Sequence, residues 1–558
     1  MRITTKIIQN NSLNNINTNK LLQDKLSQQM STEKKVNRPS DDPIVAIRAL
    51  RLRTNVNQVT QYYEKNVPDA ESWLEVTESA LSSMSEVVTD MIAQCTKGSN
   101  EDLTTSDRET ILTALKALRD EVYSTGNADY AGRYIFTGYR TDTPLTFEDA
   151  TEQKYSITEQ IDNGKIDKVI HIDSGNILDI NESNFNENGK DNGGNPINGA
   201  VDYTSVSEYQ VNQSEVHRIR LSYKDMDEFP KDADGKLIPN ISLEICTGEK
   251  EEDGEKKPIF TDIKDVVVDG TNKPTYKCAS IYEDPYKNVG DNDIVLVKET
   301  GELLLGKNVY NKLMELSDNP VTSYNEGEIR VTYEKTKWEN NDLRPEHYFA
   351  CKTPKEGNDL TVGDNIEYNQ SYLEGISDED KQTIEYDVGL NQRIRVNTTA
   401  DEVFTHDISR DVEDMIKAME DTVAMEKQVN KLKKMLETAD TANGDYDTIQ
   451  KQLAAAEKAF TFLNEKTQQM FENGISKMQK HLDAVNFAVT ENGTRGQKLE
   501  LISNRLMSQK TNFETLKSEN EDIDITDVAI KLSSAELTYS SALMATGKVL
   551  QNNLMNFI

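Results

Sequence analysis

Cysteine is scarce in this chain, and the few cysteines present form no metal-binding or redox pattern. Cys95, Cys246, Cys278 and Cys351 are the only four among 558 residues. They make no CxxC pair and no zinc-finger spacing. His347 and Cys351 lie four residues apart, but no second pair completes a metal site. We therefore expect no bound metal, while a disulfide between two of these cysteines stays open.

Positive charge is also in short supply, which restricts the possible partners. The 63 lysines and arginines are outnumbered by 97 aspartates and glutamates, which gives a formal net charge of −34. Nucleic-acid phosphates and anionic membrane surfaces both require a basic binding face. We therefore expect neither nucleic acid nor membrane as a partner, and we interpret the acidity as a source of solubility.

Long apolar runs and familiar catalytic motifs are missing as well. The sequence has no run of 18 apolar residues, so we expect no transmembrane helix. The first eight residues lack the apolar core of a secretory signal peptide, so we expect none to be cleaved. The middle of the chain offers no HExxH, GxSxG or CxxC motif. We therefore expect no catalytic residue, no cofactor and no enzyme activity.

Helical periodicity is concentrated towards the two ends of the sequence. Residues 9–20 include six asparagines, whose side chains compete for backbone hydrogen bonds and weaken a helix. A helix this polar is marginal alone in water, so we expect it to fold only against a partner. Its faint apolar stripe consists of Ile8, Leu13, Ile16, Leu22 and Leu26.

A break at residues 31–43 precedes the next helix. The break contains the run Arg38, Pro39, Ser40, Asp41, Asp42 and Pro43. Asp42 is placed to accept hydrogen bonds from the first turn of the helix, and Pro43 occupies the first helical position without loss. We expect this cap to contribute about 1 kcal/mol.

A coiled-coil seam begins directly after this cap. Its residues alternate in steps of four and three over more than six heptads. Pro68 interrupts the seam, and because proline inside a helix costs about 3 kcal/mol or leaves a kink, we predict a bend at residues 66–69. A second helix is predicted at about 107–127, and residues 130–139 then lead into a strand. The seam consists of Val45, Ala49, Leu52, Val56, Val59, Tyr63, Asn66, Ala70, Trp73, Thr77, Ala80, Met84, Val87 and Met91.

Between residues 146 and 395 the pattern changes to short alternating segments. Strands are predicted at 216–223, 263–268, 293–297 and 328–334. The dipeptides at 163–164, 188–189, 234–235 and 269–270 are Asn-Gly or Asp-Gly and predict turns. Residues 232–235 faintly resemble a calcium loop, but the remaining ligands are absent, so a hairpin turn is the better interpretation.

Helical pattern returns at about residue 408. Two apolar stripes, one ending near Leu436 and one starting at Ile449, are separated by Asn443-Gly444-Asp445, which predicts an antiparallel hairpin at about 425–470. The final helix carries a stripe too wide for a single partner. Its apolar residues include Ile525, Val528, Leu532, Tyr539, Leu543, Val549, Leu550, Leu554 and Phe557.

These patterns predict an α+β protein with a long antiparallel coiled-coil helical rod. The paired N- and C-terminal regions form the rod, and a β-rich outer domain is inserted between them. The predicted segments are an N-terminal helix and loop, the first half of the rod, the outer domain, the second half of the rod with its hairpin, and a C-terminal helix. Their bounds are 1–43, 44–145, 146–395, 396–524 and 525–558.

Four pieces of the sequence resemble the flagellin superfamily, and within it the hook–filament junction proteins of the hook-associated protein three family. They are the opening Met1-Arg2-Ile3-Thr4-Thr5 before an Asn-rich helix, the Arg38–Pro43 run, the Gly132–Tyr139 run with its Tyr-x-Phe-x-Gly pattern, and the C-terminal helix with residues 522–529 before it. The resemblance covers roughly residues 1–147 and 385–558. Pro68 and the long 425–470 hairpin depart from the family pattern.

The resemblance implies a structural role in the bacterial flagellum. A ring of copies would join the hook to the filament and template flagellin polymerisation. Its neighbours would be another hook-associated protein on the hook side and flagellin on the filament side, with an export chaperone on the C-terminal helix before export by the flagellar type III system to the cell exterior. Residues 1–30 and 525–558 would form an inner tube, and the outer domain would point outwards. The interaction residues would be Ile8, Ile16, Leu22, the Arg38–Pro43 run and the apolar residues of the last helix.

Three alternatives remain open. The first is a flagellin with a large insert, which would polymerise indefinitely, and the Arg38–Pro43 run argues against it. The second is a flagellin-like scaffold whose insert is an enzyme, which the missing motifs disfavour. The third is a coiled-coil adhesin, which would carry a secretory signal.

Overall fold

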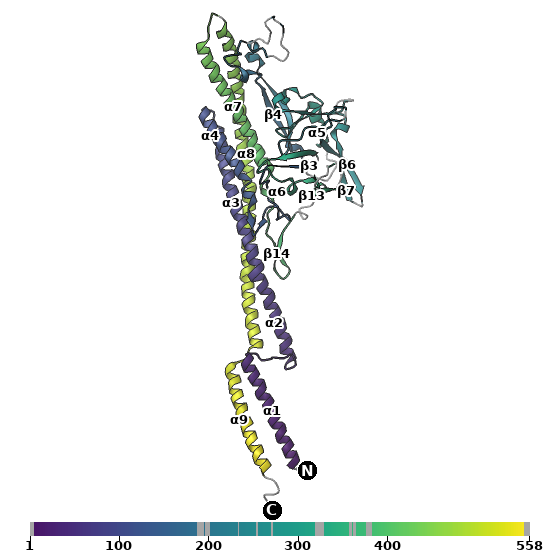
Figure 1. The fold of residues 1–558 in the computed structure, drawn as a ribbon, viewed down its shortest axis with the longest axis vertical. Coiled ribbons are helices and arrows are strands. Elements are labelled where there is room, and N and C mark those ends of the chain that lie inside the picture. Colours follow the sequence, from purple (N-terminus) through teal and green to yellow (C-terminus); the bar gives the residue numbers. More distant parts are fainter. Residues whose placement is uncertain are drawn as a thin grey trace, which may run out of the picture. The chain divides into compact units, whose positions relative to one another are not determined.

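The computed structural model describes residues 5–186, 193, 195, 201–232, 234–252, 255–268, 272–317, 329–355, 360, 364–374, 382–442 and 444–551 (Figure 1). The chain forms two compact units. The first unit comprises Met1–Ser72, Glu385–Arg395 and Arg495–Ile558, and the second comprises Trp73–Ile384 and Val396–Thr494. Residues from both ends of the sequence therefore fold together in the first unit.

Helices α1 (Thr5–Thr32) and α9 (Ile525–Gln551) lie side by side in the first unit (Figure 1). They run antiparallel, because the backbone N–H of Ile523 donates to the carbonyl of Glu33 where one helix has ended and the other is about to begin. Their shared apolar core is small. It consists of the buried Leu26, Val528 and Ala535 with Ile523 and Leu532 packed against them.

A second antiparallel pair in this unit joins α2 (Pro43–Gln61) to the last part of α8 (Asp445–Glu521). Asn520 donates to the carbonyl of Val45, whereas Lys510, earlier on α8, pairs at 2.6 Å with Glu64, which follows α2. The two helical segments therefore run in opposite directions. A short hairpin completes the unit. Its strands are β14 (Glu385–Gly389) and β15 (Gln392–Arg395).

The irregularity predicted around Pro68 is a π-turn. Residues Tyr62–Asn66 form a π-helix, in which the N–H of Val67 bonds to the carbonyl of Tyr62. Pro68 has no N–H to donate, and its ring would meet the carbonyl four residues earlier in a regular helix. A π-helical turn contains one residue more than a regular α-helical turn, and here it lies directly before Pro68, where it shifts the hydrogen-bond register. The disturbance therefore lies one turn before the predicted bend, and α3 (Val67–Gly98) continues through Pro68.

The second unit contains four packed helices, namely the rest of α3, α4 (Thr105–Val122), α7 (His406–Thr438) and the first part of α8. The predicted seam is buried here, with Trp73, Met84 and Met91 at 1% exposure or less. Helix α4 starts with a capping box between Thr104 and Asp107, and it ends at Val122 rather than near 127 as predicted. Asn127 instead closes a short 3₁₀ turn.

The predicted helical hairpin is confirmed. Helix α7 ends at Thr438 and α8 begins at Asp445, while Gly444 adopts a φ of +79°, a left-handed value that glycine takes without strain. The hydroxyls of Thr422 and Thr467 lie 2.8 Å apart between the two helices. Helix α8 is 77 residues long and includes three glycines, Gly474, Gly493 and Gly496, without interruption.

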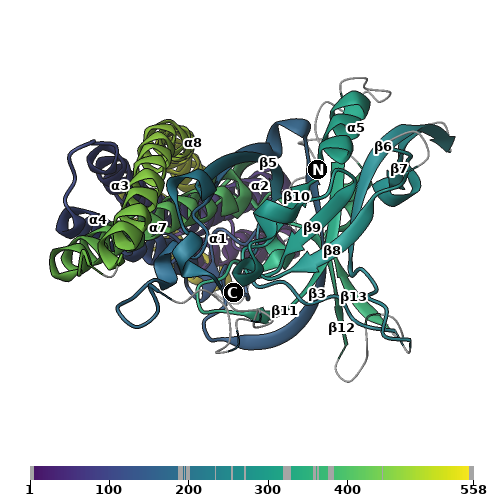
Figure 2. The same cartoon turned by 90° about the horizontal axis from the view of Figure 1, so that it is seen from above.

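A β domain, which we define as two sheets and helix α5 (Lys307–Ser317), completes the second unit (Figure 2). The five-stranded sheet has the order β4 (Ile166–Asp173), β5 (Asn212–Arg220), β10 (Glu302–Leu305), β9 (Asp293–Val297), β8 (Thr275–Ala279). The six-stranded sheet has the order β13 (Asn365–Tyr368), β12 (Ala350–Pro354), β3 (Thr151–Ile161), β11 (Ile329–Trp338), β6 (Ile241–Glu252), β7 (Glu255–Asp262). All paired strands are antiparallel except β8 with β9.

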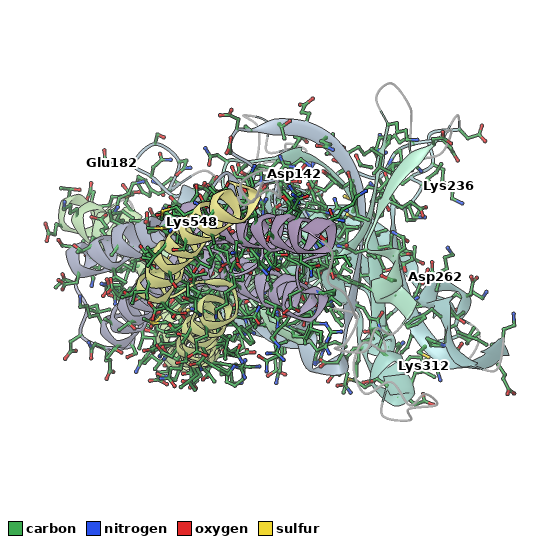
Figure 3. The ribbon with its side chains drawn as sticks, turned by 90° about the horizontal axis from the view of Figure 1, so that it is seen from below. Asp142, Glu182, Lys236, Asp262, Lys312 and Lys548 are labelled. Carbon is green, nitrogen blue, oxygen red and sulfur yellow. The ribbon has the colours of Figure 1, made fainter. Side chains whose placement is uncertain are left out.

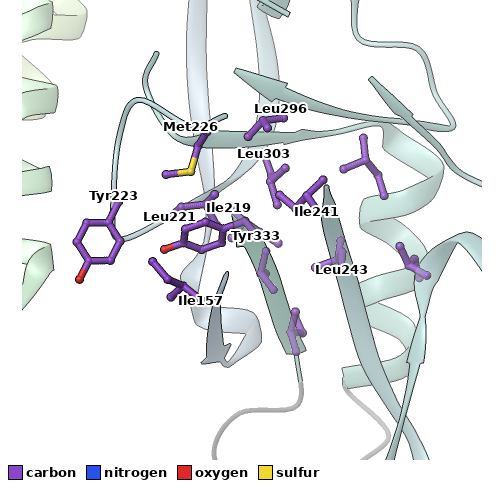
Figure 4. Packing of buried hydrophobic residues seen from close by; sticks show 14 of the residues in the cluster. Ile157, Ile219, Leu221, Tyr223, Met226, Ile241, Leu243, Leu296, Leu303 and Tyr333 are labelled. Carbon is purple, nitrogen blue, oxygen red and sulfur yellow. The ribbon is translucent and has the colours of Figure 1, made fainter. Parts of the chain in front are cut away.

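The two sheets share one hydrophobic core (Figure 4). Ile219, Leu296 and Leu303 enter it from the first sheet, and Leu243 and Tyr333 enter it from the second. Alternation along β11 explains this burial, because every second residue from Ile329 to Tyr333 is buried. Charged side chains such as Glu182 and Lys236 lie on the surface of the unit instead (Figure 3).

Most strand predictions in the middle of the chain are confirmed, and one is wrong. Strand β9 matches the prediction at 293–297, whereas β5 ends at Arg220 within the predicted 216–223, and β11 runs from Ile329 to Trp338, beyond the predicted end at 334. The predicted strand at 263–268 is instead a 3₁₀ turn, Ile263–Asp265, capped by the side chain of Asp262. Residues 130–139 contain two short paired strands, β1 (Asp129–Tyr130) and β2 (Arg133–Tyr134). Local propensity could not reveal that the 263–268 segment has no strand to pair with.

The hairpin interpretation of residues 232–235 is supported by the structure. Lys231 and Leu237 form an antiparallel bridge, and Gly235 takes a φ of +79° between them. The Asp232 side chain accepts hydrogen bonds from the N–H groups of Asp234 and Lys236. The predicted turns at 188–189 and 269–270 lie outside the described residues.

Candidate assembly surface

The loop that leads into α2 is held by its own aspartates. Asp42 caps α2 as predicted, with an extended backbone and a carboxylate oxygen 3.1 Å from the N–H groups of both Ile44 and Val45. Asp41 accepts from the N–H of Arg38 at 3.1 Å, which closes the preceding turn. Every residue from Arg38 to Pro43 is exposed, apart from the half-buried Asp42. The loop is thus ordered by local bonds and offers its outer side to solvent.

A network of charges ties this loop region to the turn between α8 and α9. The guanidinium of Arg53 donates two parallel hydrogen bonds to the buried carboxylate of Glu521, at 2.6 and 2.7 Å. The N–H of Lys35 donates to the carbonyl of Glu521 at 2.7 Å. The hydrogen bond from the Lys34 ammonium holds the pKa of the Asp522 carboxyl below its usual value. Two-pronged arginine–carboxylate pairs fix geometry as well as adding stability.

Apolar side chains on α1 and α9 remain largely exposed outside their small shared core. Leu21 is 71% exposed on α1, and Ile530 and Leu537 are 65% and 71% exposed on α9. Met544 is also exposed and continues the seven-residue spacing of the last two, so these three lie along one side of the helix. We call Leu13, Leu21, Leu22, Ile530, Leu537, Leu543 and Met544 the terminal apolar surface.

A second exposed apolar group lies on the first turns of α2. Ile44, Ile47 and Leu50 are all more than half exposed, although they follow directly after the Asp42 cap. Contiguous exposed apolar side chains are unusual on monomeric soluble proteins and mark interaction sites. In the first unit such side chains therefore occur on α1, α2 and α9.

The predicted interaction residues on α1 and α9 differ in how exposed they are. Leu22, Ile525 and Leu543 are exposed, and Ile16, Leu532 and Tyr539 are half-buried. Val528 is buried against α1 and instead belongs to the core that joins the two helices. The side chains of Ile8, Val549 and Leu550 are not described, and Leu554 and Phe557 lie outside the described residues.

Sequence analysis missed several members of this surface. Leu21, Ile530, Leu537 and Met544 lie outside the predicted stripes, which include residues of the pairing face such as Val528 and Leu532. The seven-residue spacing of the last three was a usable signal. Arg53 and Glu521 were missed because their pairing joins positions 468 residues apart.

No set of three or more His, Cys, Asp or Glu among the described residues is placed to hold a metal ion. Cys95, Cys246, Cys278 and Cys351 are all free thiols. No helix in the described part of the chain is long and apolar enough to cross a membrane. What the surface does offer is uncovered apolar area and a rigid polar loop beside it.

Comparisons with known proteins agree with these features. Residues 3–141 match the family model of the bacterial flagellin N-terminal helical region. Flagellar hook-associated protein 3 of Salmonella typhimurium is 32% identical over 170 residues, which are 30% of this chain and 53% of that protein. The Escherichia coli protein of the same name is 33% identical over 168 residues, or 29% and 52% of the two chains. A flagellin of Clostridium tyrobutyricum is 28% identical over 122 residues, or 22% and 32%.

Solved structures give matches of low similarity. The flagellar junction protein FlgL from Legionella pneumophila is 9% identical with a TM-score of 0.26, over 86% of this chain and all of that one. FlgL of Xanthomonas campestris is 11% identical with a TM-score of 0.26, over 84% and 99%. These values carry no argument here. The matched sequence spans about half the length of the curated relatives, and the sequence matches confirm the resemblance to hook-associated protein three of the flagellin superfamily.

Proposed function

We propose that this chain is a structural subunit of the bacterial flagellum that joins the hook to the filament and templates flagellin polymerisation. The observation that carries the proposal is the terminal apolar surface, which α1 and α9 leave uncovered. Helix α1 lies within residues 3–141, which match the bacterial flagellin N-terminal helical region, and this supports the assignment. An exposed surface of this kind is useful only to a protein that is covered by neighbours.

The energetics favour assembly through this surface. Burying a leucine or isoleucine side chain fully is worth about 1.5–3 kcal/mol. Leu21, Ile530 and Leu537 are each about two-thirds exposed or more, so each retains most of that free energy for an intermolecular contact. The small core around Leu26 means that α1 and α9 gain little from pairing with each other alone. We infer that several copies form a ring in which these helices line the inside.

The remaining partners follow from the same surface. One face of the ring would contact a hook-associated protein and the other would contact flagellin. Before export through the flagellar type III system, a chaperone would cover α9, because an exposed apolar stripe in the cytoplasm promotes aggregation. The mature protein would then lie outside the cell in the flagellum. The β domain has a closed core of its own, so it needs no partner to remain folded.

Paired substitutions on α9 test this proposal. The variant Ile530→Asp/Leu537→Asp removes apolar surface from two exposed positions, and Ser533→Asp/Ser540→Asp adds the same charge at the same spacing without apolar loss. Both should fold as the native protein does by circular dichroism. In a bacterium that depends on this protein, the first variant should shed monomeric flagellin into the medium, and the second should bear normal filaments.

Normal filaments with the first variant would refute the proposed assembly surface. Polymerisation of the purified native chain alone into long filaments would instead favour the flagellin alternative, since a junction protein stops after one layer. The 28% identity to a flagellin makes this second outcome worth distinguishing.

A further inference from the structure

A cavity of about 560 Å³ lies in the second unit between β4 and the facing parts of α7 and α8. Pockets that hold small molecules are typically about 300–1,000 Å³, so this one has room for a small ligand. Val169 and Ile170 of β4 line one side, and Met415 and Met470 of the two helices line the other. Exposed residues such as Gln469 also line it, so a ligand can enter from solvent.

Most charged side chains around the cavity already have partners. Arg218 is paired with both Glu302 and Asp414, and the hydroxyl of Tyr286 donates to Glu302. The Nε2 atom of His171 lies 3.1 Å from a carboxylate oxygen of Asp284. These paired groups form fixed polar walls.

Two charged groups in the lining are different. Asp421 on α7 and Lys466 on α8 are half-buried, and neither forms a hydrogen bond or ion pair with any residue that the structure describes. Burial raises the pKa of Asp421 and lowers the pKa of Lys466, and the attraction of Lys417 and Lys466 for Asp421 only partly offsets this effect of burial. A half-buried charge without a partner is costly, so each group would gain from a ligand group of opposite sign.

We propose that this cavity binds a small zwitterion, a free α-amino acid or short peptide, with its carboxylate against Lys466 and its ammonium against Asp421. A simple anion could pair with Lys466 but would leave Asp421 without a partner. A simple cation such as a polyamine would leave Lys466 without a partner. A zwitterion satisfies both, and Met415 and Met470 provide contacts for an apolar side chain.

Titration calorimetry of the full-length chain with each of the common free amino acids and with dialanine tests this inference. We expect at least one of these probes to bind. Its N-acetyl and amide derivatives, which lack the ammonium and the carboxylate charge respectively, should each bind at least tenfold more weakly. The variants Lys466→Gln and Asp421→Asn should also weaken binding at least tenfold.

Lys480→Gln is a matched control, because Lys480 is exposed on the same helix and does not line the cavity. It should bind as the native chain does. Absence of binding by every probe would overturn the inference and leave a water-filled cavity. Binding that survives both cavity substitutions, or that tolerates loss of either ligand charge, would overturn it as well. The derivative series keeps the test decisive even if a variant fails to fold.

Discussion

The attachment of the β domain to α7 gives a sharp prediction at Asp411. Its carboxylate is 6% exposed and accepts from Arg220 on β5 at 2.7 Å and from Lys477 on α8 at 2.8 Å, with His481 at 3.5 Å. Burial alone would raise the pKa of Asp411, but contacts with His481, Arg220 and Lys477 hold it well below its usual range. Asp411 is therefore charged at neutral pH and is the anion that connects one strand to two helices.

Replacing Asp411 with Asn keeps the shape of the side chain and removes its charge. Arg220 retains Asp414 at 2.9 Å and the more distant Asp407 at 3.9 Å, and Lys477 loses its carboxylate partner among the described residues. Removing one member of a buried ion pair typically costs about 3–5 kcal/mol. We expect a loss in this range for the second unit. Asp120→Asn is the control, since Asp120 is 61% exposed and exposed pairs are worth about 1 kcal/mol or less.

The two tryptophans of the chain allow the loss to be localised. Trp73 lies in α3 and Trp338 in β11, and both are almost fully buried. With Trp73→Phe the remaining fluorescence follows the β domain during urea unfolding, and with Trp338→Phe it follows the helices. In the Asp411→Asn background both probes should report lower stability, because the residue joins both parts. A loss below about 1 kcal/mol at both probes would refute this account of the ion cluster.

Two further predictions concern the first unit. Asp42→Ala should destabilise α2 by about 1 kcal/mol, because the N–H groups of Ile44 and Val45 lose their acceptor. The exposed Ser40→Ala is the control, and equal thermal midpoints of the two variants would count against the cap. Arg53→Ala should weaken the loop between α8 and α9 by about 1 kcal/mol, a value reduced because Arg53 is half exposed. Amide hydrogen exchange at Lys35 and Ile523 should then quicken, and equal rates in Arg53→Ala and the exposed control Arg51→Ala would contradict the role of the pair.

Features set by neighbouring residues could be predicted from the sequence. The Asp42 cap depends on residues within one turn, and the Gly444 connection depends on a glycine between two apolar stripes. The buried positions of α3 follow from a regular spacing. In each case the same few residues determine both the pattern and the structure, so no knowledge of distant partners is needed.

Features that depend on distant partners could not be predicted. Arg53 and Glu521 pair although they lie 468 positions apart, and Arg220 and Asp411 pair although they lie 191 positions apart, and nothing local marks either partner. The segment at 263–268 has strand-like composition but forms a 3₁₀ turn. The cavity at Asp421 and Lys466 arises only when β4 meets two helices. Periodicity also could not show which face of α9 pairs with α1 and which stays open.

The α7–α8 hairpin contacts part of the chain between β4 and β5. Gln428 donates to the carbonyls of Ile177 and Ile180 at 2.9 Å each, and Gln452 donates to those of Phe185 and Tyr203 at 3.0 and 2.8 Å. Both glutamines are buried.

Because these bonds go to main-chain oxygens, they hold the backbone at Ile177, Ile180, Phe185 and Tyr203 whichever side chains these positions carry. Selection can therefore vary exposed residues there, such as Tyr209, while the fold that displays them is kept. The hairpin thus serves as a frame on which an external surface can diversify without a change of architecture.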